Sequence, residues 1–185
     1  MNHDIRPAIL SDAAAILAAE QETALQPGQL VSSVEELRLD TFKQSIQELR
    51  HSGRYIVAEM KDRIVGHACL SPMGLKAISH VFRLTIIVHP GFRRQGISAA
   101  LLSDLLQWAQ SDSRVQKIEL LVRVANEPAI QLYLKFGFVE EGRLHKRIRL
   151  PDGAFMGKVW ANAIHSKPRG IDATRSGVES EGERE

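Results

Sequence analysis

Apolar positions in the first third of the chain recur with the spacing of helices. Residues 11–20 are rich in alanine, contain two large aliphatic side chains and begin at a serine that suits an N-cap. A loop is expected at residues 23–31, with a second helix after it. Ser33 and Glu36 match a capping box, and apolar residues continue at roughly helical spacing until Gly53, where this helix is expected to end.

The pattern then changes to short apolar runs that predict strands. Residues 55–60 and 64–70 flank a polar turn at residues 61–63, an arrangement that is typical of a β-hairpin. Residues 81–88 give the strongest strand, because alternate side chains form one wholly apolar face while the other face is mixed.

The second half of the chain alternates helices with strands and ends in another hairpin. Asn126 is a natural N-cap, and Pro128 lies within the first turn of the helix that follows. The Pro-Asp-Gly sequence at residues 151–153 favours a tight turn. The predicted elements are a helix containing Ile97, Leu101, Leu105 and Trp108, a strand at 117–124, a helix at 126–136, and paired strands at 138–150 and 154–163.

This order combines hairpins with a strand–helix–strand unit, and it predicts an α/β fold in which a mixed sheet is flanked by helices. A single domain is expected over residues 1–165. Residues 166–185 contain only Ile171 and Val178 as large aliphatic side chains among many charges and glycines. Such a segment cannot bury enough apolar surface to order itself, so we expect a disordered C-terminal tail.

Composition and charge narrow the class of protein. The chain has 185 residues, of which 44% are hydrophobic and 25% charged, as in soluble globular domains. Its net charge of +2 is too small to indicate nucleic-acid binding by itself. The single cysteine, Cys69, excludes an internal disulfide, and no Cys/His spacing predicts a metal site. Without an apolar run of membrane-spanning length or a signal-peptide core, a cytoplasmic location is expected.

The segment from Val88 to Ser98 joins the strongest strand to the following helix and contains glycines and arginines. Such a turn directs backbone N–H groups and the positive end of a helix dipole toward an anion. A nucleoside triphosphate loop is disfavoured because Ile97 stands at the lysine position, and a dinucleotide loop because its first glycine pair is missing. The pyrophosphate pattern [QR]-x-x-G-x-[GA] is filled by Arg93, Gly96 and, imperfectly, Ser98.

A second motif follows at the next strand–helix junction. Residues 126–138 contain Asn126, Ala129, Tyr133 and the pair Gly137-Phe138 in the pattern N-x-x-A-x-x-x-Y-x-x-x-G-F. With the pyrophosphate pattern before it, the chain resembles the GCN5-related N-acetyltransferase (GNAT) family over roughly residues 5–163. The resemblance implies a mostly antiparallel central sheet and acetyl-CoA as co-substrate.

The same resemblance implies roles for individual residues at the two motifs. Backbone groups of Ile86 and Val88 would pair with the pantetheine arm of acetyl-CoA and polarise its thioester carbonyl. Asn126 would cap its helix and also contact the cofactor. The residues that would surround the pyrophosphate are Arg93, Arg94, Gln95, Gly96, Ser98 and Ala99.

Tyr133 is the candidate that would donate a proton to the departing CoA thiolate, although its ring also suits simple packing on the core. The general base is less defined. Protein N-terminal acetyltransferases of the family often have a glutamate five positions before the asparagine, where this chain has Leu121. Glu119, two residues earlier on the same side of the strand, is the candidate base, and a strand-surface carboxylate is the alternative. Further candidates without support from spacing are His67, His89, Glu20 and Glu22, and a water chain would need no single base.

The closing hairpin resembles the branch of the family that acts on free amino acids and small amines. A site for the amine is expected between the first two helices, the loop at residues 26–28 and this hairpin. Direct attack in a ternary complex is expected rather than an acyl-cysteine intermediate, since Cys69 lies on a hairpin strand taken to be remote from the cofactor. Arg143, His145, Arg147 and Arg149 alternate, which predicts either a solvated basic face or contacts with an acceptor carboxylate or the 3′-phosphate of CoA.

Other functions remain open at this point. The acceptor could instead be a protein N-terminus or lysine. A module of another class could bind acetyl-CoA as a catalytically silent sensor. Nucleic-acid and membrane partners are not expected, and a homodimer is compatible with the sequence.

Overall fold

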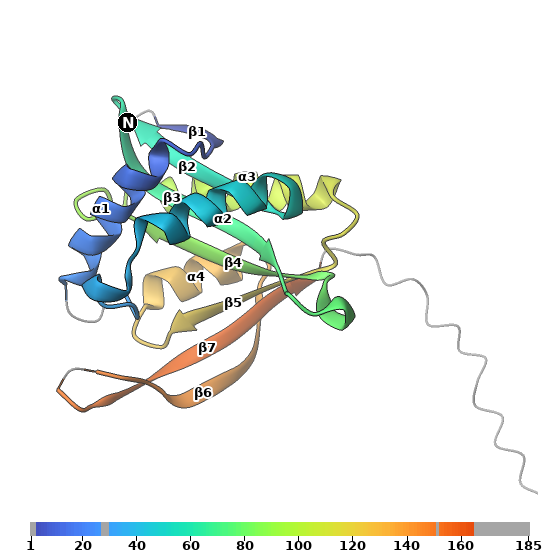
Figure 1. Cartoon of the computed structure of the whole chain (residues 1–185). Coiled ribbons are helices and arrows are strands. Elements are labelled where there is room, and N and C mark those ends of the chain that lie inside the picture. Colours follow the sequence, from blue (N-terminus) through green and yellow to red (C-terminus); the bar gives the residue numbers. More distant parts are fainter. Residues whose placement is uncertain (1–2, 27–29, 151, 165–185) are drawn as a thin grey trace, which may run out of the picture.

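A computed structural model describes residues 3–26, 30–150 and 152–164, and within them a seven-stranded sheet is flanked by four α-helices (Figure 1). The elements are β1 (Asp4–Pro7), α1 (Asp12–Ala24), α2 (Leu39–Ser52), β2 (Arg54–Met60), β3 (Arg63–Pro72), β4 (Val81–Val88), α3 (Ile97–Ser111), β5 (Lys117–Arg123), α4 (Glu127–Lys135), β6 (Val139–Arg149) and β7 (Phe155–Ile164). Single 3-10 turns lie at Val34–Glu36 and Lys76–Ile78.

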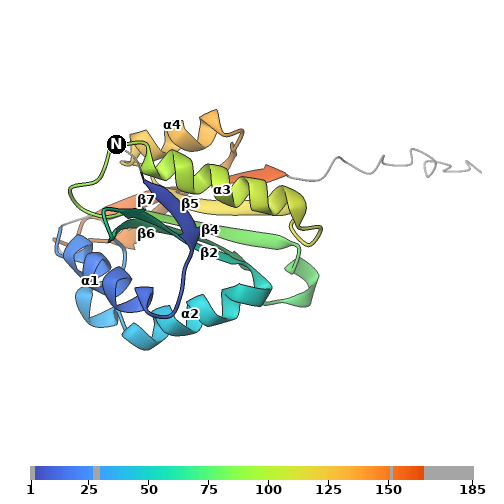
Figure 2. The same cartoon turned by 90° about the horizontal axis from the view of Figure 1, so that it is seen from above.

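The strands lie in the order β1-β2-β3-β4-β5-β7-β6. Only β4 and β5 pair in parallel, and every other neighbouring pair is antiparallel. The view from above shows α1 and α2 on one face of the sheet and α3 and α4 on the other (Figure 2). The predicted fold class, a mixed and mostly antiparallel sheet flanked by helices, is therefore confirmed.

The main core lies between the sheet and α3. Leu101, Leu102 and Leu105 of α3 are wholly buried, and they belong to one apolar cluster with Phe82 of β4 and Ile118 of β5. Alternate residues of a strand share a face, so the even-numbered side chains of β4 and β5 supply this core. A second cluster lies under α1 and α2 on the opposite face, where the two helices pack on β2 and β3. The odd-numbered side chains of β4 and β5 consequently lie on the face that bears α1 and α2.

Two features differ from the elements expected from the sequence. The strand β1 was not predicted, because only one of its four residues, Ile5, is apolar and its pairing partner in β2 is distant along the chain. The helix predicted from Ser33 is interrupted: Glu36 Oε2 accepts the Ser33 N–H at 2.8 Å as a capping box requires, but the backbone becomes extended at Leu37. The longer helix α2 begins at Leu39.

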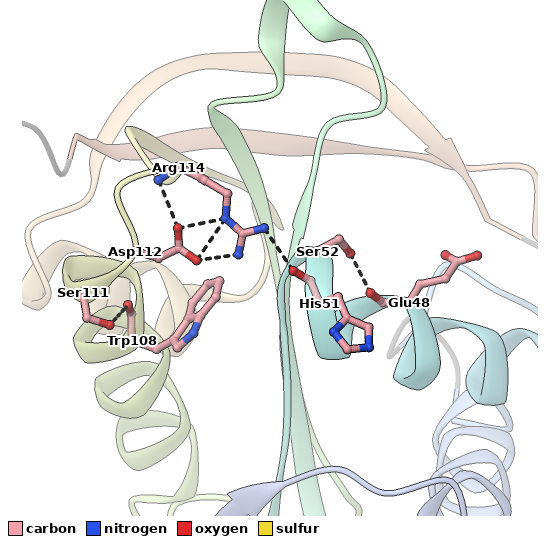
Figure 3. Close-up of polar contacts among 7 residues, drawn as sticks. All are labelled: Glu48, His51, Ser52, Trp108, Ser111, Asp112 and Arg114. Carbon is pink, nitrogen blue, oxygen red and sulfur yellow. Dashed lines mark hydrogen bonds and ion pairs between the residues drawn. The ribbon is translucent and has the colours of Figure 1, made fainter.

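An arginine connects the C-terminal ends of helices on opposite faces of the sheet (Figure 3). Arg114 donates from Nη2 to Asp112 at 2.6 Å and from Nη1 to the carbonyl oxygen of His51 at 3.0 Å. This contact fixes the end of α2 beside the end of α3 and satisfies a helix carbonyl that has no partner within its own helix. In the same region Ser52 and Ser111 donate to the carbonyl oxygens of Glu48 and Trp108.

The other predicted helices and strands are confirmed, with boundaries that differ by a few residues. The Pro27-Gly28 loop, Pro151 and the expected tail at 166–185 lie outside the described residues. In the ranges that the structure describes, no helix is both long and apolar enough to span a membrane.

Candidate active site

The sheet opens between β4 and β5. β4 pairs with β3 along nearly its whole length, from Phe82 to Val88. Its parallel pairing with β5 covers only three positions and ends at Arg83, opposite Glu119. β5 continues along β7 as far as Arg123. The two strands therefore separate after Arg83 and Glu119, which leaves one edge of β4 without a strand partner.

The unpaired edge is formed by the even-numbered residues of β4. The His89 N–H donates to the Val65 carbonyl at 2.9 Å, and the Val81 carbonyl accepts from Met73, so odd-numbered backbone groups face β3. Successive residues of a strand direct their backbone groups to opposite sides. The N–H and C=O groups of Ile86 and Val88 consequently face the gap, where an extended ligand could pair with them.

The turn after β4 presents a helix N-terminus without a side-chain cap. Gly96 is the N-cap of α3 with a φ of +80°, and no side chain accepts a hydrogen bond from the first turn. The Ala100 N–H donates to the Gly96 carbonyl at 3.0 Å. The three preceding N–H groups, of residues 97–99, remain available to an anion. A Cβ added at Gly96 would meet no atom within 4 Å, so open space lies in front of these donors.

The side chains of this turn have different roles. Arg93 and Arg94 are exposed, and Arg94 takes a left-handed φ of 60°. Gln95 turns back and donates to the Gly91 carbonyl at 3.3 Å, so it braces the turn. Ile97 is 1% exposed in the main core, which explains why no lysine occupies this position.

A cation that the sequence analysis did not single out lies next to the turn. Arg123 ends β5, and burial together with repulsion by Arg93 lowers the pKa of its guanidinium. Neither arginine forms an ion pair with a carboxylate in the described part of the chain. Two neighbouring cations without a counter-charge favour an anionic ligand between them. Arg93 and Arg123 are far apart in the sequence and become neighbours only through the fold. No local pattern could therefore have identified the pair.

The second motif lies on α4, across the gap from β4. Asn126 is the N-cap, as predicted, and its Oδ1 accepts the Ala129 N–H at 3.4 Å. The Tyr133 ring packs against Phe138, with 5.6 Å between centroids, and borders a small cavity beside Val122 of β5. Burial raises the pKa of Tyr133 to about 12. A phenol of this kind keeps its proton at neutral pH and can act as a donor.

Glu119 lies at the point where β4 and β5 separate. Its carboxylate is 3.0 Å from Lys117 Nζ, and the same ammonium contacts Glu141 at 3.0 Å. Partial burial opposes the charged form of Lys117, but the hydrogen bonds with Glu141 and Glu119 raise its pKa. Glu119 therefore lies beside the gap and already has a cationic partner.

Three of the other candidate bases come together under α1. Tyr55 Oη lies 3.0 Å from Nδ1 of His67, and Nε2 of the same ring lies 3.1 Å from Glu20 Oε1. The His89 ring is tilted against His67, with 5.6 Å between centroids. Burial, followed by repulsion from His67, lowers the pKa of His89 to about 4, so this imidazole is neutral at pH 7. All four side chains are buried, which prevents direct contact with a substrate amine.

The remaining candidate, Glu22, is exposed and borders a surface pocket beside Arg63 and Asp62, separate from this buried group.

The structure also places Cys69 and the basic residues of β6. Cys69 lies on β3 in register with Thr85, so it is adjacent to β4 but on the side of that strand away from the gap. Burial raises the pKa of this thiol to about 11, which opposes formation of a nucleophilic thiolate. The expected alternation of basic residues along β6 is interrupted at His145 and Arg147, because the register with β7 shifts between Leu144 and Ile148 and Lys146 takes a left-handed φ of 50°. Arg143 and Arg149 lie opposite Val159 and Phe155, so these two do share one face.

Comparisons with known proteins agree with this geometry. Residues 17–138 match the model of the Acetyltransferase (GNAT) family. The chain is 32% identical to the L-amino acid N-acetyltransferase AaaT of Escherichia coli over 103 residues, which are 56% of this chain and 63% of that enzyme. It is 30% identical to an N-alpha-acetyltransferase of Sulfolobus acidocaldarius over 104 residues, which are 51% of this chain and 62% of that protein. The chain thus spans less than two thirds of either relative.

A solved structure shows the same fold over nearly its whole length. The structure of yncA from Salmonella typhimurium with its cofactor acetyl-CoA superposes with a TM-score of 0.82 at 18% identity. The superposition covers 94% of this chain and 99% of that one. Because the family model matches most of the chain, including both motifs up to Phe138, the chain belongs to the GNAT acetyltransferase family.

Proposed function

We propose that the protein is an acetyl-CoA-dependent N-acetyltransferase that moves the acetyl group to a primary amine of a small molecule such as an amino acid. The observation that supports this most directly is the opening between β4 and β5, which ends at an uncapped helix N-terminus. An extended pantetheine arm suits the unpaired edge of β4, and a pyrophosphate suits the N–H groups of the turn. The amino-acid acceptor is supported by the similarity to the Escherichia coli enzyme.

In this proposal the backbone binds and orients the cofactor. Ile86 and Val88 donate and accept hydrogen bonds along the gap, while residues 96–99 surround the phosphates together with Arg93 and Arg94. Asn126 keeps the start of α4 in place through its Oδ1, so its amide nitrogen is left to donate to the cofactor. Acetyl-CoA, when bound, supplies the thioester whose acetyl carbon the amine attacks.

Proton transfer is assigned to two side chains beside the gap, on opposite faces of the sheet. Tyr133 retains its proton because burial raises the pKa of the phenol to about 12, and it donates toward the sulfur of the leaving thiol. Glu119, at the point of separation, accepts the proton of the amine, directly or through water. The thiol of Cys69 takes no part, since burial keeps it protonated and transfer is direct from acetyl-CoA to amine.

A second candidate function is acetylation of protein N-termini. It is supported by the similarity to the N-alpha-acetyltransferase of Sulfolobus acidocaldarius. Leu121 stands where the corresponding glutamate is often present in such enzymes, so this candidate lacks its usual base.

The test is a thiol-release assay with acetyl-CoA and a panel of amino acids, simple amines and peptides with free N-termini. Release of CoA with amino acids, together with acetylated product by mass spectrometry, supports the proposal. Release with peptides alone favours the second candidate. Tight acetyl-CoA binding with no release on any amine would instead indicate a catalytically silent sensor.

A further inference from the structure

Among the described residues, no helix packs closely over one face of β5, β7 and the adjacent part of β4. α1 and α2 lie over β2 and β3, and in Figure 1 the strands β5 and β7 continue beyond these helices. Leu121 and Trp160 lie in register on this face and are 37% and 36% exposed. The opposite face of the same strands is closed by the main core, where Leu120 and Val122 are buried. The exposed face therefore offers a flat apolar platform next to the gap.

Charged side chains that neutralise one another border one end of the platform formed by Leu121 and Trp160. At the N-terminal end of β5, Lys117 neutralises Glu119 and Glu141, and its ammonium also lies 5.6 Å from the centre of the Trp160 ring. These charges have partners and do not require a ligand.

On the other side of the platform the charges are cationic and unpaired. Arg123 lies in register with Lys158, two residues beyond the Leu121–Trp160 pair. Arg83 of β4 shares this face at the level of Glu119, and its positive charge is close enough to repel that of Lys158. None of these three cations forms an ion pair within the residues that the structure describes.

Lys158 is the point where these cations meet. Burial, followed by repulsion from Arg147, Arg123 and Arg83, lowers the pKa of Lys158, and no carboxylate opposes that effect. Arg147 comes from the part of β6 where the register with β7 shifts, and its charge acts on Lys158. Concentrating like charges costs free energy unless an anion binds between them.

We propose that this face binds the acceptor, with Arg83, Arg123 and Lys158 holding a carboxylate and the Leu121–Trp160 platform holding an apolar group. The acceptor is therefore an amine that also carries a carboxylate and an apolar side chain, which is the chemistry of an apolar α-amino acid. This inference rests on the proposed acetyl transfer. Two residues along a strand span about 6.6 Å. Extended lysine and arginine side chains are long enough to cross this distance, so cations at either end of the platform can reach the same carboxylate.

Matched acceptor pairs test the carboxylate site. L-Leucine is compared with 3-methylbutylamine and L-phenylalanine with 2-phenylethylamine, because each pair differs only in the carboxylate. A charge-assisted hydrogen bond contributes about 1.5–3 kcal/mol, so the wild type should prefer each amino acid at least about tenfold in kcat/KM. Lys158→Gln and Arg83→Gln should each reduce this preference to about threefold or less, mainly through the KM of the amino acid. Lys43→Gln, at an exposed position on α2, is the control and should keep the full preference.

The results distinguish this site from a contact with the phosphates of CoA. A loss in Lys158→Gln that affects the amino acid and the amine equally, with a raised KM for acetyl-CoA, would assign the cations to the cofactor and overturn the proposal. A wild type that acetylates both members of each pair equally would also overturn it. Trp160→Ala should lower kcat/KM for leucine relative to glycine by about tenfold, from the lost burial of the side chain.

A binding measurement keeps the proposal testable if no acceptor is acetylated and the proposed function itself fails. N-Acetyl-L-leucine should quench the fluorescence of Trp160 saturably, N-(3-methylbutyl)acetamide should bind at least about tenfold more weakly, and Trp160→Phe should lose the signal. Lys158→Gln should weaken binding of the acetylated amino acid alone. If both compounds quench equally, or if neither compound quenches, the carboxylate site is contradicted, whether or not the protein acetylates any acceptor.

Discussion

Replacing Gly96 with glutamate separates two properties of this residue: its left-handed backbone conformation and its position in front of the N–H groups that would bind a phosphate. Gly96 adopts a φ of +80° in front of the free N–H groups of α3, and a Cβ there meets nothing within 4 Å. A side chain in this conformation costs roughly 1–2 kcal/mol of strain. A carboxylate about 4 Å from a bound phosphate adds a repulsion of about 4 kcal/mol at an effective dielectric constant of 20, or roughly a thousandfold in Kd.

Gly153→Glu is the matched control for this change. Gly153 has a φ of +84° and the same open surroundings, but it lies in the β6–β7 turn. Both variants should lose similar stability, with Tm lower by roughly 2–8 °C. Only Gly96→Glu should lose acetyl-CoA affinity, measured by calorimetry and by the missing rise of Tm with ligand. Gly96→Asn, an uncharged residue that tolerates this conformation, should retain most of the affinity. Equal acetyl-CoA affinity in the two glutamate variants would refute the assignment of the turn.

Three further predictions concern proton transfer and stability. Tyr133→Phe should lower kcat by about a hundredfold with little change in acetyl-CoA affinity, and unchanged turnover would remove the phenol from the mechanism. Glu119→Gln should lower kcat at neutral pH, whereas a rate within twofold of the wild type would exclude it as the base. His89 has a pKa lowered from 6.5 to about 4, so the unfolded chain takes up this proton first as the pH falls. The free energy of unfolding should therefore decrease by roughly 3 kcal/mol between pH 6.5 and 4, and in His89→Gln a denaturant series should show a correspondingly smaller decrease.

The pattern of apolar and capping residues along the sequence was sufficient to predict most helices and strands of the fold. The strand at 81–88 and the helix capped by Asn126 were predictable because alternation and capping are properties of neighbouring residues. β1 was not, because Asp4–Pro7 has almost no apolar pattern and is a strand only through its pairing with β2. The break at Leu37 also escaped prediction, since a correct capping box at Ser33 says nothing about how far a helix continues.

The residues of the site differ in the same way: some are neighbours in the sequence, and others are brought together only by the fold. The turn and the Asn126–Phe138 motif are continuous in sequence, so they could be recognised without a structure. The group of Arg83, Arg123 and Lys158 could not, because three strands contribute one residue each. Glu20 and His67 meet only because α1 packs on β3. The strand order that inserts β7 between β5 and β6 decides which side chains border the gap.

Amide hydrogen exchange, measured by NMR at single residues, tests whether acetyl-CoA binds along the unpaired edge of β4. The N–H groups of Ile86 and Val88 face the gap, while those of Thr85 and Ile87 face β3. Saturating acetyl-CoA should slow exchange at Ile86 and Val88 at least about tenfold and change the two neighbours much less. Unchanged exchange at both residues, with binding shown independently by calorimetry, would contradict the account.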